Sequence, residues 1–267
     1  MITTIEIDTI EQALGILSEQ EYDAQIKRFR SPYFSRGEPD AAFRLKTTLS
    51  RNCKSHAREL EPALLRNFTK YAVNEDPTIE DSVWRQMIVG RHHGLPTRTL
   101  DWSHSPLIAL HFTTTGESPK NISLHDSVIW RIDMDEVHSL LPQKYRDALN
   151  ANDTYVFDLD MLSGIAPTLE EYDRDMGSSS MVFVEPPSID QRIINQYSFF
   201  GVVPGGMQDI ESFLQERTSG TVRYIIKKEI RWRIREMLDQ LNVNERMVYP
   251  GLDGLSSWLA RHYYVSE

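Results

Sequence analysis

A block of polar residues at positions 91–112 constrains this chain more than any other segment. It reads RHHGLPTRTLDWSHSPLIALHF and holds two arginines, four histidines, one aspartate and one tryptophan, with a Gly-Leu-Pro turn near its start and an apolar run at its end. Polar groups this dense and this mixed in charge fit neither a hydrophobic core nor a solvated helix face. We therefore expect the block to connect two helices and to hold the functional site.

The segments around this block alternate between helical and strand patterns. This predicts an α+β fold, a single domain with many helices around short, mostly antiparallel strands. Strands are expected at 31–37, 127–132, 181–184 and 222–226. Helices are expected at 8–21, 59–72, 78–94, 105–116, 135–151, 189–196, 207–215, 228–241 and 252–262. The acidic stretch 164–180 is expected to be a mobile loop. We assign residues 1–24 to an N-terminal helical extension and residues 25–267 to the main domain.

The distribution of charge points to a small anionic ligand. The chain has a formal net charge of −10, which argues against a general polyanion binder, because phosphate contacts need clustered Lys and Arg. Residues 27–70 nevertheless contain eleven basic and four acidic residues, whereas residues 151–190 contain nine acidic and one basic. A local basic face of this kind suits a small anion or a nucleotide better than extended nucleic acid. Alternatively, the two faces pair with each other or are solvated.

The sequence contains no pattern of a membrane protein or a secreted protein. The first residues lack a positive start and an apolar signal core, and no run approaches the roughly 20 apolar residues that cross a bilayer. Cys53 is the single cysteine, which excludes an intrachain disulfide and a cysteine-based zinc site. We expect a soluble, cytoplasmic protein with no membrane partner, and the sequence leaves its oligomeric state open.

The four histidines of the block do not form a metal-binding pattern. His92 and His93 are adjacent, so on a helix they point about 100° apart. His104 and His111 share a helix face only if that helix begins before Pro106. An HExxH pair, a GxxxxGK[ST] phosphate loop and a GxGxxG segment are all missing from the sequence. We therefore expect no metal ion.

Arg36 is a candidate for binding an anion. It follows an aromatic strand and precedes Gly37, so its guanidinium is expected at a strand end beside a close backbone turn. That position suits bidentate capture of a phosphate or a carboxylate. The alternative is a buried ion pair that organises the fold, with Asp101 or Glu38 as the partner.

Further candidates lie within the block and on a later helix. Asp101 either pairs with Arg98 and caps the next segment, or orients a ribose hydroxyl or a nucleophile. Trp102 either packs in the core or stacks on a base or a nicotinamide ring. Arg192 and Gln196 share one helix face and are candidates for a wall of the same pocket.

Two of these elements resemble the FRG domain family, which is named for a Phe-Arg-Gly triplet. The triplet is present here as Ser35-Arg36-Gly37, with the aromatic residue at Phe34. The block 91–112 resembles the family's central pattern, QHHG-x-PTRLLDWT-x-SP-x-x-AL-x-FA. Its main departures are Arg91 for Gln, Thr99 for Leu, Ser103 for Thr and Thr113 for Ala.

Two later elements extend this resemblance to about residues 25–265. Arg192 and Gln196 resemble a late Arg-x-x-x-Gln element of the family, and residues 249–255, YPGLDGL, resemble its C-terminal Phe-Pro-Asp-Leu-Asp-Gly-Leu segment. The resemblance implies membership of the family. It implies little chemistry, because FRG domains are largely uncharacterised and a fold alone does not define a function.

A weaker similarity is to the layout of ADP-ribosyltransferases. In that layout an early Arg holds NAD, a Ser or Thr follows, and a late carboxylate stabilises the oxocarbenium-like state. The corresponding positions here are Arg36, Ser103 or Ser105, and Gln196. A glutamine carries no negative charge, so Asp101 or Glu185 would have to supply it. The similarity implies NAD as the substrate.

These considerations define two sets of site residues. The candidate catalytic residues are Asp101, Gln196 and Ser103. The candidate ligand-binding residues are Arg36, Gly37, His92, His93, Arg98, Trp102, Ser105 and Arg192. We expect an NAD-using, ADP-ribosyltransferase-like enzyme or a nucleotide-directed bacterial toxin or defence effector, and this hypothesis predicts that Arg36, Arg98, Asp101 and Trp102 converge on one cleft.

Two alternatives remain open at this point. The first is a non-catalytic module that binds a small anionic ligand or a partner protein through the same polar pocket. The second is a buried polar network that fixes the fold, with the function elsewhere in the molecule.

Overall fold

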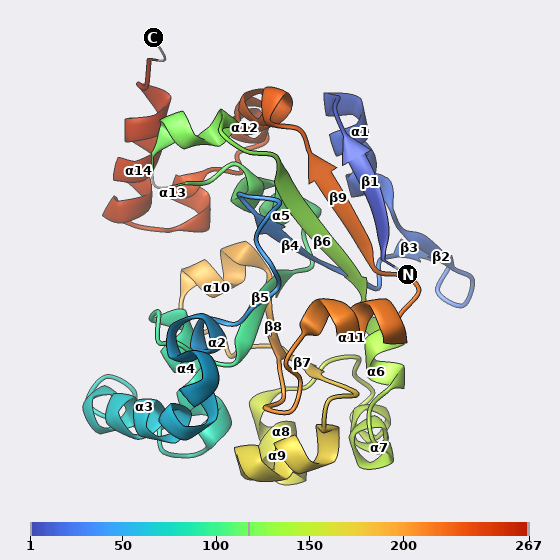
Figure 1. The fold of residues 1–267 in the computed structure, drawn as a ribbon, viewed down its shortest axis with the longest axis vertical. Coiled ribbons are helices and arrows are strands. Elements are labelled where there is room, and N and C mark those ends of the chain that lie inside the picture. The colour runs from blue at the N-terminus through green and yellow to red at the C-terminus, as the bar shows by residue number, and fades with distance from the viewer. Residues whose placement is uncertain (1, 117, 266–267) are drawn as a thin grey trace.

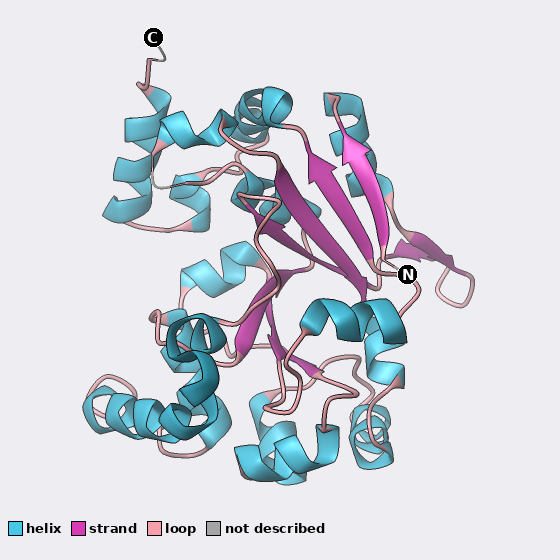
Figure 2. Cartoon of the chain, viewed as in Figure 1, coloured by secondary structure: helices cyan, strands magenta, loops and turns pink. Residues whose placement is uncertain are grey.

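A mixed sheet runs through the centre of the molecule (Figures 1 and 2). The computed structural model describes residues 2–116 and 118–265. Seven of the described strands form the sheet in the order β1 (Thr3–Ile7), β9 (Val222–Ile226), β6 (Ser127–Asp133), β4 (Tyr33–Glu38), β5 (Thr99–Ser103), β8 (Ser198–Val202) and β7 (Val182–Val184). Strands β1 and β9 are parallel, and the other neighbours are antiparallel. The predicted α+β class with mostly antiparallel strands is confirmed.

The sheet divides between β4 and β5. These two strands pair through one residue pair, Ser35 with Ser103, whereas β4 and β6 pair along their whole length. In Figure 1 the strands β1, β9, β6 and β4 form one part of the sheet, and β5, β8 and β7 continue below it. A small ribbon of β2 (Glu21–Asp23) and β3 (Arg28–Arg30) stands outside this sheet.

Helix α5 (Pro106–Thr113) covers one face of the upper part of the sheet. It contacts β4 and β6 and packs against α12 (Arg231–Gln240), which in turn contacts α1 (Ile10–Gly15). Ala109, Ile129 and Ile234 belong to the buried apolar cluster between these elements. Alternate residues of a strand face opposite sides, so the other face of the sheet carries a second cluster that includes Phe34 and Trp130.

A third apolar cluster lies around β7 and β8 and joins helices from two separate parts of the sequence, residues 57–92 and 143–176. These helices are α3 (Ala57–Ala72), α4 (Val83–His92), α7 (Gln143–Ala151), α8 (Leu159–Ile165) and α9 (Leu169–Met176). The remaining helices are α2 (Thr48–Cys53), α6 (Met134–Ser139), α10 (Gln191–Gln196), α11 (Ile210–Arg217), α13 (Glu245–Val248) and α14 (Leu252–His262), with short 3₁₀ turns η1 (Ile16–Ser18), η2 (Lys54–His56), η3 (Pro119–Ser123) and η4 (Lys228–Ile230). Over the described residues, no helix is both long enough and apolar enough to cross a bilayer.

Several predicted boundaries follow directly from the capping residues. Thr9 caps α1 through a capping box with Gln12, and Pro106 occupies the first turn of α5, where its missing N–H needs no partner. The helix expected at 135–151 is two helices, because Pro142 interrupts the chain between α6 and α7. Helix α4 begins later than expected, since Ser82 rather than a residue at 78–81 accepts the capping hydrogen bond.

The prediction of a mobile loop at 164–180 is wrong. This stretch contains the end of α8 and all of α9, whose N-terminus is capped by Thr168. Leu169, Tyr172 and Met176 follow one another at helical spacing and are buried in the third cluster. The acidic residues between them are partly or fully exposed.

The N-terminal residues contain a strand as well as the expected helix. Strand β1 joins the sheet beside β9, and Ile7, Ala13 and Ile16 are buried in the cluster beneath α5. Residues 1–24 are therefore not purely helical, although the boundary between residues 24 and 25 stays a prediction.

Candidate functional site

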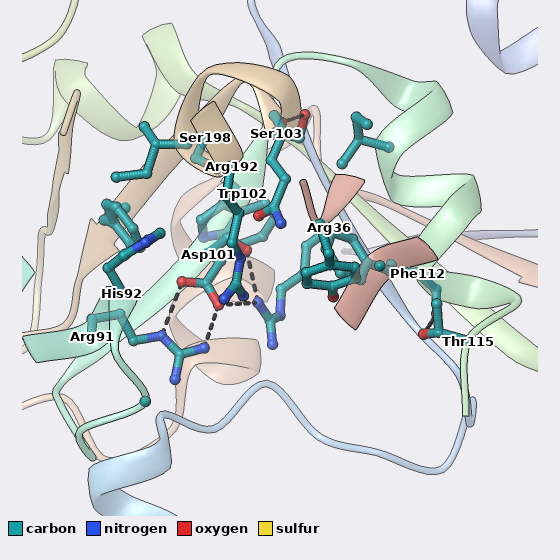
Figure 3. Close-up of a pocket in the computed structure, with 18 of the residues that line it drawn as sticks. Arg36, Arg91, His92, Asp101, Trp102, Ser103, Phe112, Thr115, Arg192 and Ser198 are labelled. Atoms are coloured by element: carbon teal, nitrogen blue, oxygen red, sulfur yellow. Dashed lines mark hydrogen bonds and ion pairs between the residues drawn. The ribbon is translucent and has the colours of Figure 1, made fainter. Parts of the chain in front are cut away.

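A cleft of about 1000 Å³ opens where the sheet divides (Figure 3). Its walls come from β4, β5, the end of α4, helix α10 and the turn that leads into α14. Strands that separate leave backbone and side-chain groups unpaired toward the gap between them. The division of the sheet therefore places polar groups around a cavity that lies next to the core.

Arg36 enters the cleft from β4, and Gly37 allows α5 to lie directly against that strand. A Cβ atom at position 37 would lie 1.9 Å from the carbonyl oxygen of Ala109, so only glycine fits here. The Arg36 guanidinium donates to Glu38 Oε1 from Nε at 2.9 Å and from Nη2 at 2.6 Å. Its Nη1 donates to the backbone carbonyl of Asp101 at 2.7 Å. Arg36 thus lines the cleft and also makes the ion pair with Glu38 that the sequence left as an alternative.

Asp101 projects into the cleft from β5 and is held by Arg91. Arg91 Nε donates to Asp101 Oδ1 at 2.9 Å, Nη2 donates to Oδ2, and Nη1 reaches the hydroxyl of Thr48 at 3.1 Å. Burial raises the pKa of the Asp101 carboxyl, but the hydrogen bonds from Arg91 and the surrounding guanidinium charges hold it below its ordinary value. The Asp101 side chain remains 37% exposed. The cleft therefore contains a fixed, ionised carboxylate that a ligand can reach.

Arg192 forms the cationic wall opposite β4. It lies on the first turn of α10, and its guanidinium carbon is 4.9 Å from the centre of the Tyr249 ring. This geometry is a cation–π contact, which orients the guanidinium without using its N–H groups. No hydrogen-bond acceptor for the Arg192 side chain is found within residues 2–116 and 118–265. Arg192 is therefore a cation with its donors available.

His92 and His93 line the cleft at the end of α4, as expected for ligand-binding candidates. His92 Nε2 lies 2.6 Å from Asp190 Oδ2, and the two imidazole rings meet edge to face at 5.1 Å. Asp190 also caps α10, where Arg192 sits. The pair of His92 and Asp190 thus connects two walls of the cleft.

Ser103 and Gln196 also line the cleft, but their polar groups are engaged within the protein. The Ser103 hydroxyl donates to the backbone carbonyl of Gln196 at 2.7 Å and accepts from the Ser105 backbone N–H at 3.0 Å. The Gln196 side-chain amide donates to the Val248 carbonyl at 3.2 Å. These contacts describe residues that shape the cleft, and a catalytic role for either stays a prediction.

The prediction that Arg98 shares this cleft is wrong. Arg98 is buried and donates from Nε to both carboxylate oxygens of Glu61 at 2.8 and 2.9 Å and from Nη1 to Asp173 at 2.5 Å. Asp173 also accepts from the Gly205 backbone N–H. The side chain thus joins β5 to α3 and α9. It forms a buried ionic network with Glu61 and Asp173 outside the cleft.

Three other predicted residues contribute less to the cleft than expected. Trp102 borders the cleft, but it is only 2% exposed and its ring packs edge-on against Phe183 in the core. This placement contradicts stacking on a ligand. Ser105 precedes α5 and does not line the cleft, and Glu185 lies exposed after β7, also away from it.

Several residues that line the cleft were not predicted as site residues from the sequence. They are Arg91, Asp190, Tyr249, Asp253 and Ser257. A signal existed for two of them, since Arg91 departs from the family pattern and Tyr249 opens the YPGLDGL segment. The contact between His92 and Asp190, which are 98 residues apart, leaves no trace in a single sequence. No group of three or more His, Cys, Asp or Glu side chains among the described residues is arranged to hold a metal ion.

Comparison with known protein families supports the resemblance noted in the sequence. Residues 31–122 match the model of the FRG domain, and this range contains Arg36, Arg91, His92 and Asp101. Arg192 and Tyr249 complete the cleft from outside the matched range. No curated protein and no solved structure matches the chain. The chain therefore carries an FRG domain, which the match places at residues 31–122.

Proposed function

We propose that the cleft binds NAD⁺ and that the protein cleaves its nicotinamide–ribose bond, in the manner of ADP-ribosyltransferases. The observation that carries the proposal is the pairing of opposite charges in one cavity. Asp101 is a fixed carboxylate, and Arg192 is a guanidinium with free donors. NAD⁺ has the complementary pattern, with a cationic nicotinamide ring and an anionic pyrophosphate.

The size and the charge of the cleft suit a ligand of this class. Its volume of about 1000 Å³ is at the upper end of ordinary small-molecule sites. A phosphate group gains charge-assisted hydrogen bonds from guanidinium groups, and Arg192 and the two remaining N–H groups of Arg36 are placed to offer them. We assign pyrophosphate binding to these two residues.

Asp101 then acts on the reacting ribose. As the bond from C1′ to the nicotinamide nitrogen breaks, its electron pair leaves with nicotinamide and positive charge develops on the ribose ring. A carboxylate that is already ionised and oriented stabilises this charge without any reorganisation. Water, or an acceptor hydroxyl or amine, then forms a bond to C1′ of the ribose and loses a proton.

The test is incubation of the purified protein with NAD⁺, followed by chromatography of the released nicotinamide. We expect release by the wild type, a large loss of kcat in Asp101→Asn, and NAD⁺ binding weakened about ten-fold or more in Arg192→Gln, measured by calorimetry. Arg174→Gln is the matched control, because Arg174 is an exposed arginine of α9 outside the cleft. Wild-type protein that is folded, concentrated and releases no nicotinamide contradicts the proposal.

A non-catalytic nucleotide-binding module is the second candidate function. It is favoured by the internal hydrogen bonds of two candidate catalytic residues, in which the Ser103 hydroxyl donates to the Gln196 carbonyl and the Gln196 side-chain amide donates to the Val248 carbonyl. This candidate predicts that NAD⁺ or another nucleotide binds with a dependence on Arg192 and is recovered unchanged. The calorimetry and the chromatography described above separate the two.

A further inference from the structure

His92 and Asp190 form a pair whose protonation can be assigned from its contacts. Asp190 Oδ1 accepts from the backbone N–H groups of Arg192 at 2.9 Å and Ile193 at 3.1 Å, while Oδ2 lies 2.6 Å from His92 Nε2. Burial raises the pKa of Asp190, but these hydrogen bonds and the contact with His92 hold it below its ordinary value. The carboxylate can only accept, so Nε2 carries the proton and donates.

In the neutral imidazole this assignment places the lone pair on Nδ1 of His92. Within the described parts of the chain it has no hydrogen-bond partner, and the His92 side chain is 7% exposed at the wall of the cleft. An imidazole that is held by a carboxylate on one nitrogen and open on the other is the arrangement of a general base.

The other groups around the cleft are less suited to take a proton. Asp101 is held at both oxygens by Arg91, and the hydroxyl of Ser103 donates to a backbone carbonyl. His93 has no carboxylate partner among the residues that the structure describes. Compared with these three residues, His92 is the one that combines a place at the cleft wall with a carboxylate-held imidazole.

We propose that His92 is the general base that activates the acceptor of the reaction, and that Asp190 is its positioning residue. The inference rests on the proposed function. With water as the acceptor, the water oxygen bonds to C1′, its proton passes to His92 Nδ1, and the electron pair of the broken bond leaves with nicotinamide. The products are ADP-ribose and nicotinamide, and the proton moves from His92 to solvent.

The experiment compares kcat and KM for nicotinamide release by the wild type and four variants, His92→Gln, His92→Gly, Asp190→Asn and His56→Asn. His92→Gln keeps an amide nitrogen that can donate to Asp190 but has no basic nitrogen. We expect its kcat to fall by about 10²- to 10⁴-fold, with KM and thermal stability unchanged. Asp190→Asn cannot select the Nε2–H form of His92, so its kcat is also expected to fall. His56→Asn removes an exposed His–Glu contact outside the cleft and serves as the control.

The outcomes separate this inference from the proposed function. Full activity of His92→Gln beside an active wild type overturns the inference alone. A loss in His92→Gln that comes with a lower melting temperature and a raised KM assigns His92 a structural role and also overturns it. No release by the wild type overturns both. Recovery of the rate in His92→Gly on addition of imidazole supports His92 as the base.

Discussion

Arg91 donates to both carboxylate oxygens of Asp101 from a position ten residues earlier in the chain. The two residues are on different elements, α4 and β5, so their contact fixes the end of the helix against the strand that carries the carboxylate. A bidentate pair of this kind restricts orientation as well as protonation. Arg91 thereby determines what Asp101 can do in the cleft.

Replacing Arg91 with Gln should raise the pKa of Asp101. Arg91 is the main group that favours the ionised form, and the charges of Arg36 and Arg192 remain as weaker contributions. Carboxyl ¹³C chemical shifts recorded against pH measure the change. Arg85→Gln, which removes an ion pair with Asp76 outside the cleft, should leave Asp101 unaffected. An unchanged Asp101 pKa in Arg91→Gln would refute the assignment.

Replacing Arg98 with Ala should destabilise the fold without affecting ligand binding. The substitution leaves Glu61, which is 2% exposed, as an uncompensated buried charge, and such changes cost roughly 3–5 kcal/mol. Urea denaturation measures the free energy of unfolding. Arg44→Ala, which breaks an exposed pair with Asp209, should cost about 1 kcal/mol or less. A loss of nucleotide affinity in the folded fraction of Arg98→Ala would instead restore Arg98 as a ligand-binding residue.

Two glycines should respond in opposite directions to alanine. Gly37→Ala places a methyl group 1.9 Å from a backbone oxygen of α5, which cannot move without displacing the helix, and overpacking of this kind costs about 1–3 kcal/mol or more. Gly164 lies in helix α8 with no atom near its added Cβ, so Gly164→Ala should stabilise by about 0.5–1 kcal/mol. Thermal unfolding of both variants checks the prediction, and equal effects would contradict the packing of α5 on β4.

The stability of the protein should fall as the pH drops from about 6.5 to about 4, in part because of His138. Its Nδ1 donates to the Tyr155 carbonyl and its Nε2 accepts from the Phe183 N–H, so the buried ring is neutral. Burial lowers the pKa of His138 from 6.5 to about 4, outweighing the hydrogen bond to Tyr155. Between these values the unfolded chain binds a proton that the folded chain does not, which costs roughly 3 kcal/mol for this residue.

Urea titrations at several pH values test this dependence. In His138→Gln the free energy of unfolding should be lower at pH 7 and should change less between pH 6.5 and 4. The exposed His125 provides the control, since His125→Gln should keep the wild-type slope. A slope in His138→Gln equal to that of the wild type would show that other groups cause the acid sensitivity.

Local signals predicted many of the elements, but they did not identify strand β5. Strand β5 was missed because Thr99–Ser103 lies inside the polar block, although Leu100 and Trp102 alternate with polar residues as in a half-buried strand. Recognising that alternation would have assigned Trp102 to the core and Asp101 to the opposite side. Arg98 precedes the strand, and its direction depends on Glu61 and Asp173, which a single sequence does not place beside it.

Only part of the candidate site could be predicted from the sequence, for the same reason. Arg36, Asp101 and Arg192 were identified from residue type and local context, and they do line one cleft. The partners that set their protonation and orientation come from distant segments, as Tyr249 does for Arg192 and Asp190 does for His92. Such contacts follow from tertiary packing, which local periodicity does not encode.

The parallel pairing of β1 with β9 has a consequence for folding of the chain during its synthesis on the ribosome. Among the described strands, Thr3–Ile7 pair with Val222–Ile226 alone, so β1 cannot pair until more than 200 further residues have been made. At about 5–20 residues per second, that interval lasts roughly 10 to 40 seconds. During it β1 lacks its partner strand, and unpaired strands of this kind can pair with other chains.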